Sequence, residues 1–154
     1  MTWLPDTAGG ETAFDRVLAL CPELQADFGA FTELFDRLLP LDPELVTLCA
    51  ARIAQILGRE ADARAAGLSA DALAALAGWR DGAHYDPRQR DCLAFAEKFV
   101  LDPHGISDAD AAAVTAHLTP PEMVAFVEAL AIYDGFLRFR VILAIESGGE
   151  GEKI

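Results

Sequence analysis

The chain has 154 residues, of which 53% are hydrophobic and 24% charged, and we expect a single globular domain over residues 1–154. Asp and Glu number 25 against 12 Lys and Arg, giving a net charge of −13, which argues against binding to nucleic acid or to an anionic membrane surface. The first residues lack the basic and apolar regions of a signal peptide, and no 18-residue stretch is both apolar and uncharged. We therefore expect a cytoplasmic protein that does not span a membrane.

Helix-start signals and apolar side chains at helical spacing predict an all-α fold of about six or seven helices. Residues 1–10 are expected to form an irregular lead-in and residues 147–154 a flexible tail. Predicted helices cover residues 14–20, 22–40, 43–58, 69–79, 87–103, 107–118 and 120–145. No segment alternates β-branched and polar residues over four or more positions, so no strand is predicted.

The last predicted helix, residues 120–145, begins with the strongest start signal in the chain, Thr-Pro-Pro-Glu at 119–122. Its apolar side chains point in nearly every direction, as is typical of a helix at the centre of a fold or between subunits. About six other helices in a small subunit leave some of these faces uncovered. We therefore expect a homo-oligomer, at least a dimer.

The three cysteines, Cys21, Cys49 and Cys92, are 28 and 43 residues apart. An odd number of widely spaced cysteines predicts neither a disulfide framework nor a cysteine-based zinc site. We expect all three to be small buried hydrophobic residues, and we expect no metal and no cofactor.

Several segments carry a resemblance to a known family. Residues 48–58 read Leu-Cys-Ala-Ala-Arg-Ile-Ala-Gln-Ile-Leu-Gly, and residues 88–97 read Arg-Gln-Arg-Asp-Cys-Leu-Ala-Phe-Ala-Glu. Three motifs follow in order: Ile-Ser-Asp-Ala-Asp at 106–110, Leu-Thr-Pro-Pro-Glu-Met-Val at 118–124 and Ala-Ile-Tyr-Asp-Gly-Phe-Leu-Arg-Phe at 131–139. This ordered set resembles the carboxymuconolactone decarboxylase and alkylhydroperoxidase-D-like (AhpD-like) family over most of residues 22–145. The resemblance implies an AhpD-like helical bundle with a long central C-terminal helix, assembled into homo-oligomers.

The redox chemistry of that family has no counterpart in these residues. Its redox members place Cys-x-x-Cys-x-x-x-His directly after the glycine that corresponds to Gly58, with a glutamate about three turns upstream. In such a motif one thiolate attacks, the second cysteine resolves, and His and Glu relay the proton. Here residues 59–66 read Arg-Glu-Ala-Asp-Ala-Arg-Ala-Ala, and an ungapped count puts Thr47 at the glutamate position, with Glu44 one turn away. The disulfide chemistry therefore transfers to no residue of this chain.

The polar residues Tyr133, Asp134 and Arg138 interrupt the most apolar helix and form the candidate ligand-binding site. Asp134 and Arg138 are four residues apart and can pair on one face. One interpretation is an anion pocket, with Arg138 binding a small carboxylated ligand and Tyr133 donating a hydrogen bond. The other is a salt bridge between helices or subunits, since a buried arginine needs a partner.

His104, in the turn Asp-Pro-His-Gly at 102–105, is the other candidate catalytic residue beside Tyr133, because its ordinary pKa suits proton transfer. The alternative, which we favour, is a loop histidine that bonds a neighbouring carboxylate or carbonyl. His84 also lies in a predicted loop, and His117 ends a helix, where a cation interacts favourably with the helix dipole. Arg52 is expected among apolar neighbours, paired with Glu44 or with an acid from another helix.

Three functions follow from these observations. The first is a binding or assembly protein that keeps the family scaffold without its thiols. The second is a non-redox acid–base enzyme of the decarboxylase or isomerase type acting on a small carboxylated substrate, with His104, Tyr133 and Arg138 as its candidate residues. The third is a peroxidase-like oxidoreductase, as in the redox members of the family.

Overall fold

The computed structural model describes residues 3–5, 9–38 and 40–146, with the backbone alone at 32–38. The predicted tail at 147–154 and part of the lead-in lie outside the described residues. Within them are eight α-helices, one 3₁₀ turn and no strand, which confirms the all-α prediction. The elements are α1 (Ala13–Leu18), α2 (Pro22–Leu38), α3 (Pro43–Ile56), α4 (Glu60–Ala65), α5 (Ala70–Ala77), α6 (Pro87–Leu101), η1 (Pro103–Gly105), α7 (Asp108–Thr115) and α8 (Pro120–Ile142).

The predicted helix starts are present as capping structures. Asp86 accepts from the backbone N–H of Gln89 while the Gln89 side chain binds back to the Asp86 N–H, a reciprocal capping box at the start of α6. Thr119 and Glu122 form the equivalent box at the start of α8. The short helix α4 was not predicted, since its N-cap position holds Arg59, which makes no side-chain capping bond.

Helix α8 ends three residues earlier than predicted, and the reason lies in the backbone at Ala144. This residue has φ = 51°, a left-handed conformation that stops a right-handed helix. The N–H of Ile145 then binds the carbonyl of Arg140 at 2.8 Å, closing the helix terminus. The turn folds Ile145 back into the interior, where it is only 1% exposed.

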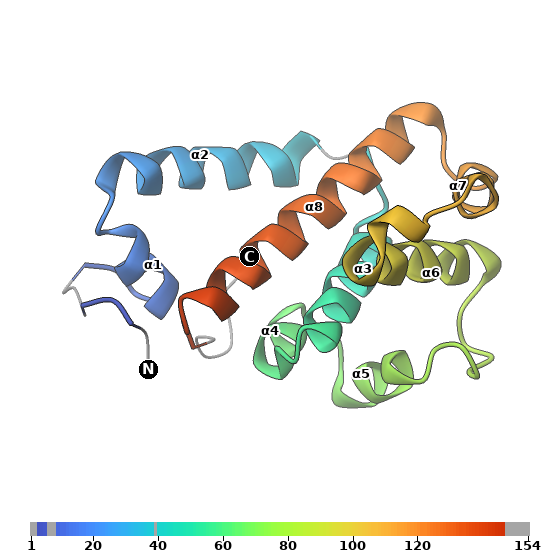
Figure 1. The fold of residues 1–154 in the computed structure, drawn as a ribbon, viewed down its shortest axis with the longest axis horizontal. Helices are drawn as coiled ribbons and strands as arrows, with labels where there is room; N and C mark the ends of the chain where they lie inside the picture. The colour runs from blue at the N-terminus through green and yellow to red at the C-terminus, as the bar shows by residue number, and fades with distance from the viewer. Residues whose placement is uncertain (1–2, 6–8, 39, 147–154) are drawn as a thin grey trace.

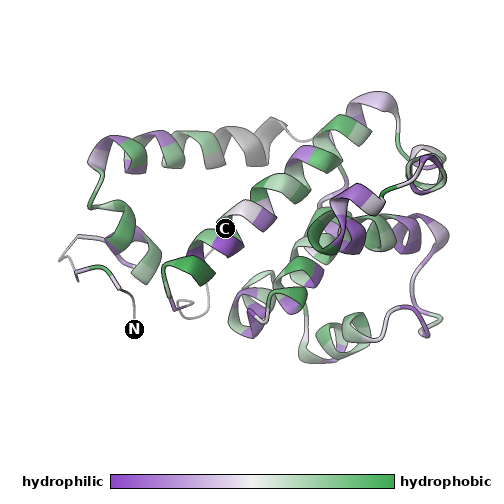
Figure 2. Cartoon of the chain, viewed as in Figure 1, coloured by the Kyte–Doolittle hydropathy of each residue, from purple (hydrophilic) through white to green (hydrophobic). Residues whose placement is uncertain are grey.

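The main hydrophobic core is built around α3, which packs against α4, α5, α6 and α8. Its side chains include Ile53, Leu93 and Leu137, all fully buried. Figure 1 shows α8 crossing the middle of the molecule, with α1 and α2 on one side and the other helices on the other. Figure 2 shows hydrophilic residues interspersed along the helices. None of the described helices has the length and apolarity needed to cross a bilayer.

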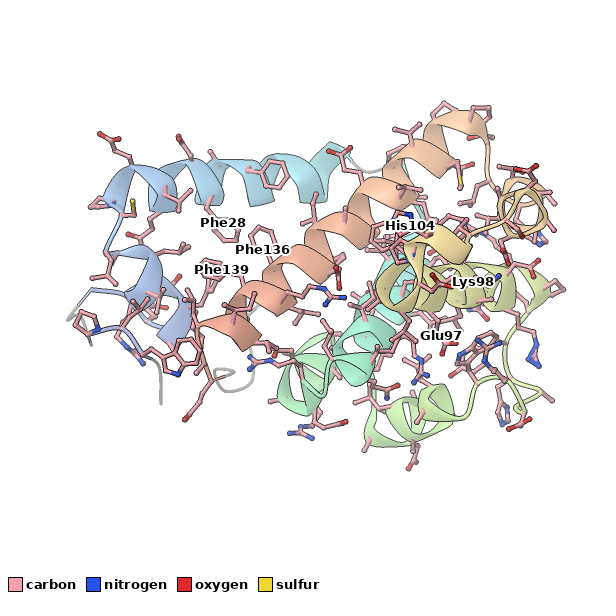
Figure 3. All side chains as sticks on the ribbon, in the orientation of Figure 1. Phe28, Glu97, Lys98, His104, Phe136 and Phe139 are labelled. Carbon is pink, nitrogen blue, oxygen red and sulfur yellow. The ribbon has the colours of Figure 1, made fainter. Side chains whose placement is uncertain are left out.

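A second, smaller core joins α1 and α2 to the end of α8. Phe14, Val17, Leu18 and Ile145 are buried in it. The ring of Phe28 on α2 meets the ring of Phe136 on α8 edge to face, with centroids 4.7 Å apart. Figure 3 shows these two rings together with Phe139 between the helices. This aromatic cluster attaches the N-terminal helices to the body of the fold.

Candidate functional site

A buried ionic network occupies the segment that follows Gly58, where the resemblance would place the redox cysteines. The carboxylate of Asp62 on α4 accepts hydrogen bonds from Arg59 Nε at 2.5 Å and from Arg140 Nη1 on α8 at 2.6 Å. Arg59 Nη1 also donates to the carbonyl of Ile145 at 2.9 Å. The chain therefore uses this segment to fasten α4 to the C-terminal end of α8.

Arg140 is the deeply buried arginine of α8, and its surroundings are structural. Its side chain and that of Asp62 are each only 2% exposed. The guanidinium carbon lies 4.7 Å from the centre of the Phe14 ring, a cation–π contact. Arg140 thus links the main core, through Asp62, to the aromatic cluster.

A second buried carboxylate, Glu97 on α6, lies between α3 and the turn after α5 (Figure 3). Oε1 accepts from Arg52 Nε at 2.7 Å and from the Trp79 indole N–H at 2.8 Å. Oε2 accepts from Arg80 Nη2. Arg52 also donates to the side chain of Gln55. The expectation that Arg52 pairs with an acid from another helix is confirmed, because it forms an ion pair with Glu97 on α6 and not with Glu44.

The environment of Glu97 fixes its ionisation state. Burial raises the pKa of Glu97, but hydrogen bonds from Trp79, Arg52 and Arg80 outweigh that effect and lower the pKa below its ordinary value. A carboxylate held ionised by three donors cannot supply a proton near neutral pH. Its donors also occupy both oxygens, so the geometry indicates a structural role for this glutamate.

The cysteines divide into two kinds. Cys49 on α3 and Cys92 on α6 are buried as predicted, whereas Cys21 is exposed. The prediction that all three are buried is therefore wrong at Cys21, which lies in the bend between α1 and α2, outside both cores. Burial raises the pKa of Cys92 to about 12. Burial, and secondarily the neighbouring Cys92, also raises the pKa of Cys49 well above its ordinary value. Neither buried thiol is a thiolate at neutral pH.

The predicted site residues on α8 are placed as follows. Arg138 Nε donates to both carboxylate oxygens of Asp134 at 2.8 Å, and its Nη2 donates to the carbonyl of Val100 on α6 at 3.0 Å. The Arg138 side chain is nevertheless 45% exposed. Tyr133 is half-buried and packs against the main core. The structure thus joins Asp134 to Arg138 and directs Tyr133 to the interior.

The expectation that Arg138 is a buried cation is not met, and helix geometry explains the difference. Residues 138 and 140 are two positions apart, about 200° around the helix axis. Position 140 therefore faces Asp62 and the interior while position 138 faces outward. The buried partner, Asp62, is 78 residues away in sequence, which no local pattern reveals.

The histidines lie at the surface. His104 is exposed on η1, four residues after Val100, and His84 is exposed in the loop before α6. His117 follows α7, and its Nε2 is 2.8 Å from a carboxylate oxygen of Asp91. Within the described part of the chain, no group of three or more His, Cys, Asp or Glu side chains is arranged to hold a metal ion.

Comparisons with known proteins identify the fold. No protein-family model and no curated protein matches the chain. A solved structure from Agrobacterium tumefaciens, described as a protein of unknown function proposed to be the antioxidant defence protein AhpD, has a TM-score of 0.76 and 19% identity, covering 92% of this chain and 100% of the other. The alkylhydroperoxidase AhpD core of an uncharacterized peroxidase-related protein from Ralstonia eutropha JMP134 has a TM-score of 0.60 and 22% identity, covering 92% and 79%.

These two likenesses establish the fold. The described residues of this chain form an all-α protein. Its architecture is the AhpD-like fold, as the ordered motifs predicted. At this level of identity, the names of the neighbours describe those proteins and carry no activity over to this chain.

Proposed function

We propose that this chain is a non-redox, homo-oligomeric member of the AhpD-like fold that acts as a scaffold or binding protein. The observation that carries the proposal is the network around Asp62. In the segment where redox relatives hold a reactive cysteine pair, Asp62 accepts hydrogen bonds from Arg59 and from Arg140. The high pKa values of Cys49 and Cys92 support the same conclusion, because a protonated thiol is a poor nucleophile.

The proposal is tested by turnover of an alkyl hydroperoxide with a dithiol reductant. We expect no rate above that of a variant with all three cysteines replaced by serine. A rate that is lost in the Cys49→Ser or Cys92→Ser variant would overturn the proposal in favour of the peroxidase-like alternative. The assembly part is tested separately by sedimentation equilibrium, where a single species of 16.5 kDa at micromolar concentration would contradict it.

One observation favours a ligand role for the site on α8. Hydrogen bonds to Asp134 and to the Val100 carbonyl fix the position of the Arg138 guanidinium before any anion binds. Because 45% of the side chain remains exposed, an anion can still reach it. A small carboxylate is one class of group that such a guanidinium binds. Thermal melts of the wild type and of Arg138→Ala with a panel of aromatic and dicarboxylic acids test this role. Stabilisation of the wild type that is absent in the variant would support it.

The acid–base alternative would use His104 and Tyr133 near that arginine. His104 lies on the turn that follows the Val100 carbonyl, so both groups are at the same end of α6. The expected signature is decarboxylation or isomerisation of an acid that also shifts the melting temperature, lost in His104→Ala. Without such turnover the binding or scaffold function stands.

A further inference from the structure

One face of α8 remains exposed along the whole length of the helix. Val124 near its start is 67% exposed and Ile142 at its end is 61% exposed. We call this face the α8 stripe, and it consists of Val124, Glu128, Ala131, Gly135, Arg138 and Ile142, all exposed. Successive members are four or three residues apart, the spacing that keeps side chains on one side of a helix.

The stripe is symmetric about position 133. Val124 and Ile142 are each nine residues from that position, Glu128 and Arg138 are each five, and Ala131 and Gly135 are each two. The two ends are therefore apolar, the centre is small, and the charges between them have opposite sign. A second α8 running antiparallel, related by a two-fold axis at residue 133, would align each member of the stripe with its counterpart.

Charge complementarity identifies the occupant of this face. In the antiparallel arrangement, Glu128 of each copy lies level with Arg138 of the other, so two opposite-charge pairs form at once. The side chain of Glu128 makes no hydrogen bond or ion pair with any described residue of its own chain. The Arg138 side chain uses Asp134 and the Val100 carbonyl and is still 45% exposed. A parallel α8 would instead place like charges together.

The centre of the stripe suits close approach of two helices. An added Cβ at Gly135 would meet no atom within 4 Å, so the fold of one copy does not require glycine there. Glycine inside a helix costs stability relative to alanine. Small side chains at a contact allow helix axes to come near the lower end of their usual separation of about 8–10 Å. Close approach of a second α8 would explain the glycine at position 135, which the packing of a single copy does not.

We propose that the chain forms a two-fold dimer in which the α8 stripes of two copies pair antiparallel, with Glu128 bonded to Arg138 of the second copy. This inference rests on the homo-oligomer of the proposed function and specifies its surface. It also assigns the exposed side of Arg138 to a carboxylate of the second copy rather than to a free acid.

A mixing experiment with two charge-reversal variants tests the pairing. Glu128→Arg places arginine opposite Arg138, and Arg138→Glu places glutamate opposite Glu128, so each variant alone should raise the dimer dissociation constant at least tenfold in analytical ultracentrifugation. In an equimolar mixture both cross-copy pairs are again of opposite sign. We expect the mixture to recover a dissociation constant within about threefold of the wild type, which a purely structural defect would not produce.

Matched variants control for charge and for folding. Asp81→Arg makes the same change of charge at an exposed turn outside the stripe, and it should leave the dissociation constant unchanged. Gly135→Trp should prevent pairing while circular dichroism shows the wild-type helix content. Ala74→Trp, at an exposed position of α5, should not prevent pairing.

The outcomes separate this inference from the proposed function. A monomeric wild type would overturn both. Two results would overturn the pairing of the α8 stripes alone. In the first, the wild type is a dimer and all three stripe variants leave it intact. In the second, the single charge-reversal variants dissociate but do not recover on mixing. Wild-type stabilisation by a dicarboxylic acid without any effect of Glu128→Arg on association would also overturn it and assign Arg138 to a free carboxylate.

Discussion

Replacing Asp62 by alanine is the perturbation with the largest expected effect on stability. Its carboxylate forms an ion pair with Arg140, at 2.6 Å, and both side chains are 2% exposed. Removing one member of a buried pair leaves the other charge in a low-dielectric interior, which costs about 3–5 kcal/mol. A chain of this size has a total stability of about 5–15 kcal/mol, so the variant should lose a large share of it.

The assay is urea denaturation followed by circular dichroism, with wild type and variant at one protein concentration because assembly contributes to stability. Asp134→Ala is the matched control, since it removes the carboxylate partner of Arg138, whose side chain is 45% exposed. Such a pair contributes less than about 1 kcal/mol. An Asp62→Ala loss no larger than that of Asp134→Ala would refute the reasoning that the Asp62 network stabilises the fold.

Three further changes have defined outcomes. Gly29→Ala within α2, where an added Cβ meets no atom within 4 Å, should raise the free energy of unfolding by about 1 kcal/mol; a loss would contradict the helical placement. Ala144→Gly should also stabilise, by about 1 kcal/mol, because φ at this position is 51°; no gain in melting temperature would count against that turn. Glu97→Gln should cost about 1.5–3 kcal/mol at pH 7. Since the pKa of Glu97 is lowered in the folded state, the difference in free energy of unfolding between wild type and variant should be largest above the ordinary glutamate pKa of about 4.3 and should shrink as pH falls below it. A difference that grows in acid would refute the lowered pKa of Glu97.

The helices could be predicted because their signals are local. Proline after an N-cap, and a reciprocal acid or amide three residues on, mark α6 and α8 within a few positions of the true start. The short α4 was missed because Arg59 gives no capping signal. The end of α8 was misplaced because a left-handed Ala144 has no sequence signature comparable to glycine.

The ionic networks were only partly predictable. The pair of Asp134 and Arg138 follows from their spacing of four and is present. Glu97 carried a usable signal, since it lies three residues before Val100 and four after Leu93, on the buried face of its helix. The link from Asp62 to Arg140 joins residues far apart in the chain, so only the packing of α4 against the C-terminal part of the fold reveals it.

The central proposal, that this chain does not perform thiol redox chemistry, is tested most directly by intact-mass spectrometry after exposure to an equimolar alkyl hydroperoxide at neutral pH. We expect Cys49 and Cys92 to remain free thiols, because both are buried and burial raises the pKa of each. Any oxidation should be confined to the exposed Cys21. A rapid loss of two hydrogens that maps to a disulfide between Cys49 and Cys92, reversed by a dithiol, would contradict the account.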